Sequence, residues 1–90
     1  MVTVDWTPHL RQHLFDTSRR RYDGATLRDV LFHAFAEEPR LRGYVLDDQD
    51  RLRQHVTVFI NGSPVQDRVR LSDVLADGDE VYVFQALSGG

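Results

Sequence analysis

The chain has 90 residues, of which 41% are hydrophobic and 28% are charged, and its formal net charge is −3. A chain this short folds as one domain with a modest core, which leaves little room for an internal catalytic cleft. The acidic balance argues against nucleic-acid binding, and no stretch reaches the ~18 apolar residues of a membrane span. Because the start of the chain also lacks an apolar leader segment, the sequence favours a cytoplasmic protein.

Cysteine and lysine are both absent, and all eleven basic residues are arginine. Without cysteine, the chain cannot form a disulfide, a thiolate metal site or a cysteine nucleophile. Without lysine, it offers no side-chain amine that could accept an isopeptide bond.

Two strands are predicted in the first quarter of the chain. Apolar and polar residues alternate over Val2–Trp6, so the first, third and fifth of these residues share one face of a strand. A second strand is predicted at Arg19–Tyr22, followed by a turn at Asp23-Gly24. The sequence leaves the conformation of residues 7–18, and later of residues 44–54, open.

The clearest element is a helix that begins after Thr26. Thr26 is a suitable N-cap, and Asp29 places negative charge in the first turn. Pro39 is expected to end the helix at Glu37 or Glu38. Apolar residues at helical spacing form one stripe, which predicts its buried face: Leu27, Val30, Leu31, Ala34 and Phe35.

The second half of the chain reads as strands and turns. Alternation predicts a strand over Val56–Ile60, and Asn61-Gly62 is a strong hairpin signal. Pro64 restricts the returning strand to a short or edge position. A turn at Asp77–Glu80 leads into a final strand that runs to Ala86. Two strands, a helix and then further strands predict an α+β domain with one helix on one face of the sheet.

Three motifs follow one another in this half of the chain: Asn61-Gly62, then Leu75–Val81 ("LADGDEV"), then Gly89-Gly90. Together they make the chain resemble the small ubiquitin-like sulfur carriers. These include the small subunit of molybdopterin synthase, the thiamine-thiazole sulfur carrier and the carrier that serves a cysteine synthase. The helix at Thr26–Leu31 also lies where such carriers place theirs. The resemblance covers residues 26–90 by motif and residues 1–24 by element type alone.

The resemblance implies a ubiquitin-like β-grasp fold, with a mixed sheet, one main helix on one face and the last strand beside the first. Residues 1–90 would form a single sulfur-carrier domain with a flexible C-terminal tail at 86–90. The tail lacks the prolines that some carriers have. The additional residues around Tyr44–Val56 make the chain more similar to the cysteine-synthase-associated carriers.

By the same resemblance, Gly90 would carry the chemistry. An E1-like enzyme would use ATP and magnesium to convert its carboxylate to an acyl adenylate, and a sulfur donor would then form a thiocarboxylate. The chain would be a carrier without catalytic residues or a bound cofactor, and a monomer when free. Its partners would be the adenylating enzyme and a sulfur-accepting biosynthetic enzyme. In the tail of Leu87, Ser88, Gly89 and Gly90, the glycines would let the backbone lie in a narrow channel.

Three aromatic residues are expected on the outer face of the sheet. If the valine and isoleucine faces of the strands pack on the helix, then Phe59, Tyr82 and Phe84 point to the other side. Such a group suggests a patch that binds a protein partner and that Arg19 and Arg21 could frame. The alternative is that the segment from Leu10 to Leu14 folds over the three rings.

Other functions are also considered from the sequence. His9 and His13 have i,i+4 spacing, but Pro8 and the lack of a third ligand favour surface histidines over a metal site. His33 and His55 read as ordinary residues. Within the family, the chain could be the small subunit of molybdopterin synthase. Outside it, the alternatives are a ubiquitin-like modifier attached through Gly90 to lysines of other proteins, or an interaction module with an inert tail.

Overall fold

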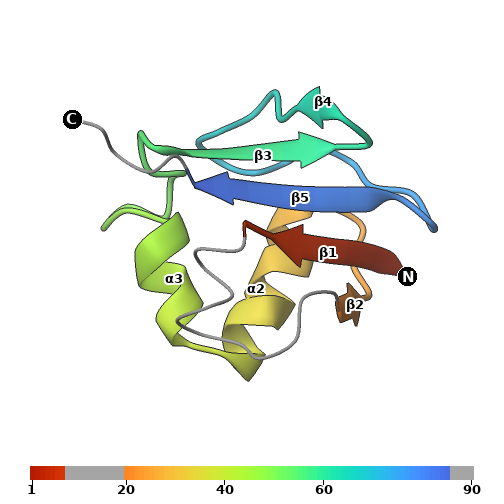
Figure 1. The fold of residues 1–90 in the computed structure, drawn as a ribbon, viewed down its shortest axis with the longest axis horizontal. Coiled ribbons are helices and arrows are strands. Elements are labelled where there is room, and N and C mark those ends of the chain that lie inside the picture. The colour runs from red at the N-terminus through yellow and green to blue at the C-terminus, as the bar shows by residue number, and fades with distance from the viewer. Residues whose placement is uncertain (8–19, 86–90) are drawn as a thin grey trace.

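A computed structural model describes residues 1–7 and 20–85 of the chain. Within these residues, five strands form one mixed sheet in the order β2-β1-β5-β3-β4 (Figure 1). The strands are β1 (Val2–Trp6), β2 (Arg20–Tyr22), β3 (Val56–Ile60), β4 (Ser63–Pro64) and β5 (Glu80–Gln85). The central strand β5 is parallel to β1 and antiparallel to β3, so the expected neighbour relation of first and last strands is confirmed. The two-residue β4 is an edge strand, as Pro64 requires.

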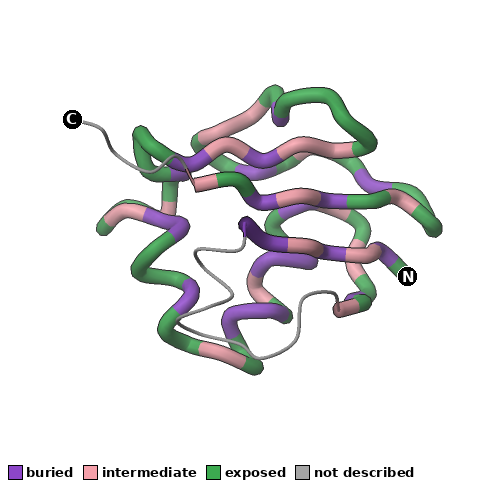
Figure 2. The backbone as a smooth tube through the Cα atoms, viewed as in Figure 1, coloured by how far each residue is buried: buried purple, intermediate pink, exposed green. Residues whose placement is uncertain are grey.

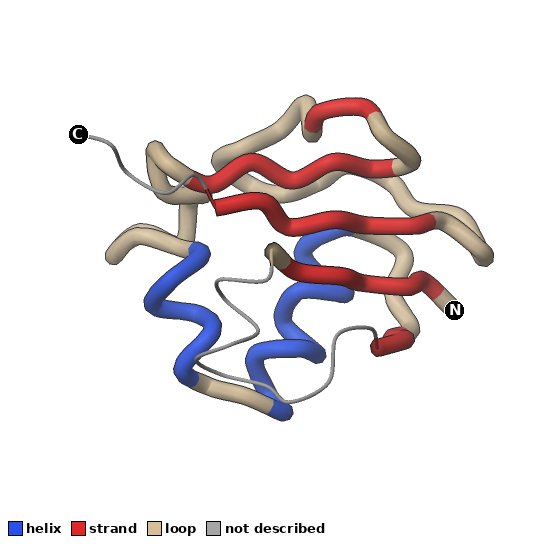
Figure 3. The backbone as a smooth tube through the Cα atoms, in the orientation of Figure 1, coloured by secondary structure: helices blue, strands red, loops and turns tan. Residues whose placement is uncertain are grey.

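Helices α2 (Leu27–Glu37) and α3 (Arg40–Val45) cover one face of the sheet (Figure 3). The start of α2 is the predicted one. The Thr26 hydroxyl accepts a hydrogen bond from the Asp29 N–H, and the Asp29 carboxylate accepts one from the Thr26 N–H. This reciprocal pair is a capping box, which satisfies two backbone donors at the helix end. Neither described helix is long and apolar enough to cross a membrane.

The second helix was not predicted. Pro39 follows the end of α2, as expected. It is also the N-cap of α3, so a second helix begins at Arg40. Leu41 and Val45 are buried one turn apart on α3 and pack into the core. A six-residue helix is too short to show periodicity, and the i,i+4 spacing of these two residues was the available signal.

The core lies between the sheet and the two helices. Buried residues alternate along β1, β3 and β5, as Figure 2 shows, and the predicted apolar stripe of α2 is buried as well. Trp6, Val58 and Val83 are fully buried. The faces predicted from strand alternation and helix periodicity are therefore confirmed, and the opposite face of the sheet has no described helix on it (Figure 1).

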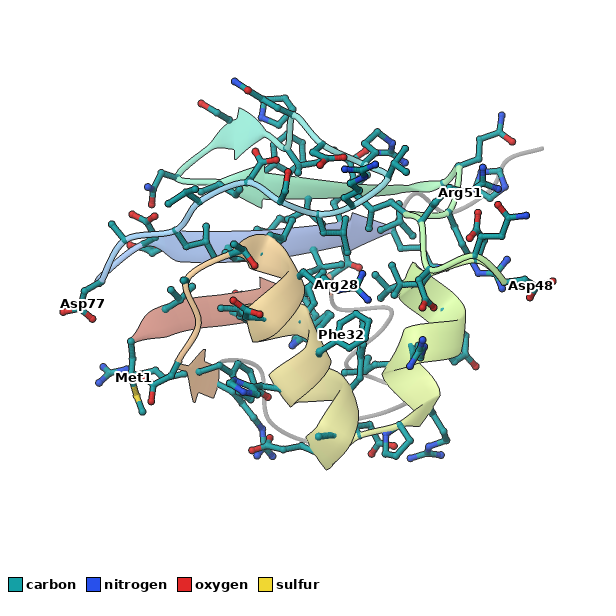
Figure 4. All side chains as sticks on the ribbon, turned by 180° about the vertical axis from the view of Figure 1, so that it is seen from behind. Met1, Arg28, Phe32, Asp48, Arg51 and Asp77 are labelled. Carbon is teal, nitrogen blue, oxygen red and sulfur yellow. The ribbon has the colours of Figure 1, made fainter. Side chains whose placement is uncertain are left out.

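At the surface, α2 and α3 are joined by an aromatic ring between two cations (Figure 4). The guanidinium carbon of Arg28 lies 4.4 Å from the centre of the Phe32 ring, and that of Arg42 lies 5.1 Å from it. Arg42 also donates to Asp50, at 2.6 Å, in the turn after α3. The Arg42–Phe32 contact joins the short helix to the long one through cation–π attraction, and the Arg42–Asp50 ion pair joins α3 to the turn that follows it.

Candidate partner-binding face

Three aromatic side chains gather on the face of the sheet that the helices leave open. Phe59 of β3 and Tyr82 of β5 lie directly opposite one another in the antiparallel register. The Phe84 ring lies 6.5 Å from both, measured between ring centres. Phe59 and Tyr82 are half-buried, whereas Phe84 is 41% exposed. We refer to these three rings as the aromatic patch; residues 10–14, the segment expected to cover it in the alternative, lie outside the described residues.

Arg21 is on the same face, because it pairs with Thr3 of β1, whose neighbours Val2 and Val4 point inward. Because β2 and β5 lie on opposite sides of β1, Arg21 is at the β2 edge of the open face. Arg19 lies outside the described residues.

A hollow of about 690 Å³, lined in part by Phe59 and Tyr82 of the aromatic patch, opens on the same face. We refer to it as the open-face hollow. Residues of β1, β3, the β3–β4 turn and the first half of β5 line it, including Thr3, Asp5, Phe59, Asn61, Glu80 and Tyr82. Sequence alternation placed Tyr82 and Phe59 on this face but did not reveal the hollow, because its shape depends on the register between strands distant in the chain.

The end of β5 is fixed to the residue that follows β1. The Gln85 N–H donates to the Thr7 hydroxyl, at 3.3 Å, and the Thr7 N–H donates to the Val83 carbonyl, at 3.0 Å. Thr7 is 5% exposed, and its bond to Gln85 is partly buried. They hold the point from which the chain continues toward Leu87, Ser88, Gly89 and Gly90, which lie outside the described residues.

The Asn61-Gly62 turn and the acidic turn at Asp77–Glu80, which the sequence analysis treated separately, meet in the structure. The Asn61 amide donates to the Asp79 carboxylate, and its carbonyl oxygen accepts from the Glu80 N–H, both at 2.9 Å. Asp79 also accepts from the Ala76 N–H, at 2.8 Å. Together with the Asn61 side chain, this bond keeps the pKa of the Asp79 carboxyl below its usual value. We call these contacts the turn junction; they fix where β5 begins.

Replacement of Asn61 by alanine is expected to lower the free energy of unfolding by about 2 kcal/mol. The variant loses both side-chain hydrogen bonds, and alanine tolerates the left-handed backbone poorly at the φ of 51° found there. Asn61→Gly is the matched control, since it removes the same bonds but accepts the backbone angle. Denaturant unfolding should rank wild type, Asn61→Gly and Asn61→Ala in falling order; equal stability of all three would mean that the turn junction contributes nothing.

The histidines form no evident site in the part of the chain that is described. The Nδ1 atom of His33 lies 2.6 Å from the Asp23 carbonyl oxygen, a local contact that joins α2 to the turn before it. His55 is exposed. Across residues 1–7 and 20–85, no group of three or more metal-ligating side chains occurs. His9 and His13 lie outside this part.

A mixed five-stranded sheet, with a helix crossing one face and the last strand between the first strand and the hairpin, defines a ubiquitin-like β-grasp domain. The sequence pattern of the ThiS family matches residues 12–90, and the chain belongs to that family of small ubiquitin-like sulfur carriers.

Three similar proteins illustrate the range of the relationship. Small archaeal modifier protein 3 of Haloferax volcanii is 38% identical over 68 residues, which cover 76% of this chain and 73% of the relative. The crystal structure of SAMP1 from the same organism is 30% identical, with a TM-score of 0.79 over 99% of this chain and 98% of the other. The crystal structure of Mycobacterium tuberculosis CysO is 26% identical, with a TM-score of 0.83 over 97% and 100% of the two chains.

Proposed function

We propose that this protein is a sulfur carrier whose Gly90 carboxylate is activated by an E1-like adenylating enzyme in the cytoplasm. The observation that supports the proposal most strongly is the ThiS-family match. It covers residues 12–90 and so includes both Gly89 and Gly90. In this proposal the domain is a protein co-substrate rather than a catalyst, and a sulfur-accepting biosynthetic enzyme is its second partner. The cysteine-synthase pathway is the favoured destination, and molybdopterin synthase is the alternative within the family.

The chemistry follows from the poor reactivity of a carboxylate. Attack of the Gly90 carboxylate on the α-phosphate of ATP, with magnesium held by the partner enzyme, forms an acyl adenylate and releases pyrophosphate. A hydrosulfide equivalent then adds to the acyl carbon and expels AMP, which leaves a thiocarboxylate and a proton. The sulfur anion is the nucleophile in the final transfer. Neither glycine carries a side chain that would shield the acyl carbon or widen the tail.

A second function has a specific observation in its favour. The relative that is 38% identical is named a small archaeal modifier protein, so attachment of Gly90 to amines of other proteins is the competing outcome of the same activation. Both functions need the acyl adenylate and differ in the nucleophile that captures it. Capture of the acyl adenylate by sulfide makes the chain a sulfur carrier. Capture by a lysine amine of a target protein makes it a protein modifier.

Intact-mass measurement of the protein purified from its native cell tests the proposal. We expect a fraction of the chains to carry sulfur in place of one terminal carboxyl oxygen, and the purified protein to form an acyl adenylate with ATP and the adenylating enzyme. Conjugates to target lysines without any thiocarboxylate would identify a modifier instead. Failure to form the acyl adenylate at all would disprove both the carrier function and the modifier function. An interaction domain would then be the remaining alternative.

The aromatic patch is the surface that we propose the adenylating enzyme holds, because a tail gains from proximity only when the domain behind it is fixed. Replacing Phe84 by serine is expected to leave thermal stability near the wild-type value, since the ring is 41% exposed. Partner binding should weaken by roughly 2 kcal/mol, as at a hot spot. Thermal melting and the adenylation rate at sub-saturating concentration check the two statements. A large drop in melting temperature would place Phe84 in the core, and an unchanged rate would exclude it from the interface.

A further inference from the structure

The open-face hollow has an aromatic floor and a carboxylate at one side. The strand register aligns Asp5 of β1 with Tyr82 of β5, and Tyr82 with Phe59 of β3. Two residues earlier on β5, Glu80 lies beside Thr3. Because these residues share the outer face of adjacent strands, the Glu80 carboxylate stands at the edge of a surface formed by the Tyr82 and Phe59 rings.

Acidic side chains stand in the hollow. Among the described residues that line it are Asp5 and Glu80, and none of these described residues is an arginine or a histidine. Glu80 is exposed, and the turn junction binds its backbone N–H rather than its carboxylate. Among the described residues, no cation forms an ion pair with the Glu80 side chain. This carboxylate is therefore available to a group that enters from outside.

A carboxylate next to aromatic faces suits one side chain better than the others. A guanidinium is planar and weakly hydrated, so it can stack on a ring and donate to a carboxylate at the same time. An ammonium is a compact and strongly hydrated charge, and an apolar side chain would leave the Glu80 carboxylate buried without a partner. We infer that the hollow receives an arginine side chain of the adenylating enzyme, an inference that rests on the proposed function for the identity of that partner.

The position of the hollow determines what this contact does. Glu80 begins β5 and Gln85 ends it, so at about 3.3 Å per residue the Glu80 end of the hollow lies roughly 17 Å from the point where the tail begins. A contact so far from the reacting carboxyl is the same before and during acyl transfer. Interactions that are equal in ground and transition states improve binding without raising the rate at saturation. The arginine contact therefore increases affinity and leaves the chemical step unchanged.

The first experiment needs no partner enzyme. Nα-acetyl-arginine amide is titrated into the protein while amide chemical shifts are recorded, with Nα-acetyl-citrulline amide as the uncharged probe of the same shape. We expect the arginine probe to shift the signals of Phe59, Glu80 and Tyr82, and the citrulline probe to have little effect. In Glu80→Gln the response should be lost, whereas it should persist in Asp48→Asn, which removes an exposed carboxylate from the turn after α3 (Figure 4). Equal responses to both probes, or an unchanged response in Glu80→Gln, would overturn the inference.

The second experiment measures adenylation of the same variants by the adenylating enzyme. Loss of one charged hydrogen bond predicts a KM about tenfold higher for Glu80→Gln, with kcat unchanged, and wild-type constants for Asp48→Asn. A wild-type KM for Glu80→Gln would show that this enzyme does not use the hollow, while adenylation of Gly90 itself would stand. If wild type is not adenylated, the proposed function fails and the probe titration alone decides whether the hollow binds a guanidinium. The two failures are therefore distinguishable.

Discussion

Removal of Gly90 is expected to abolish both the acyl adenylate and the thiocarboxylate, while the melting temperature stays at the wild-type value. The shortened chain still ends in a carboxylate, but that group is displaced by about 3.5 Å relative to the domain that the enzyme holds. Since a misplacement of 1 Å can cost about 100-fold in rate, we expect a loss of at least this size. Adding one bulky residue after Gly90 should have the same effect, because it moves the carboxylate the other way.

Ser88→Ala is the matched control for the tail, and it should be loaded with sulfur as wild type is. Intact mass after incubation with ATP, the adenylating enzyme and sulfide reports all four proteins in one assay. Normal sulfur loading of the chain that lacks Gly90 would disprove the carrier hypothesis, whatever the family relationship.

The largest loss of stability is expected for Phe35→Ala. Phe35 belongs to the buried stripe of α2, is 5% exposed, and its ring centre lies 5.6 Å from that of Phe32. Truncation of a buried phenylalanine removes its transfer free energy and leaves a cavity, so the free energy of unfolding should fall by about 3–5 kcal/mol. That is a large share of the stability of a domain of this size.

Phe84→Ala removes the same atoms from the open face and should cost no more than about 1 kcal/mol, because the ring already contacts water. Chemical denaturation of the two variants under identical conditions compares the two faces directly. Similar losses in both would mean that the aromatic patch is covered and that the sheet is buried on both sides.

The sequence predicted the parts of this fold that depend on local periodicity. Alternation over Val56–Ile60 and over the final strand gave the inner and outer faces, and the helical stripe that ends at Phe35 gave the helix face. Thr26 and Asp29 predicted the start of α2 because a capping box is a local interaction. These features need no knowledge of distant residues.

What could not be predicted depends on contacts between residues far apart in the chain. Asn61 and Asp79 each suggested a turn, but nothing local indicates that they bind one another across 18 positions. The open-face hollow arises from the register of β1, β3 and β5, which no single strand specifies. Helix α3 was missed for a different reason, since its stability comes from packing Leu41 and Val45 into the core rather than from its own length.

The central position of β5 also has a mechanical consequence. The strand is hydrogen-bonded to β1 on one side and to β3 on the other, and the tail continues from its end. A force on the tail that acts along β5 would load the interstrand bonds on both sides in shear, so that they share the force instead of opening one after another as at a sheet edge. A partner that pulls on the tail in this direction would have to break the bonds to both neighbouring strands together.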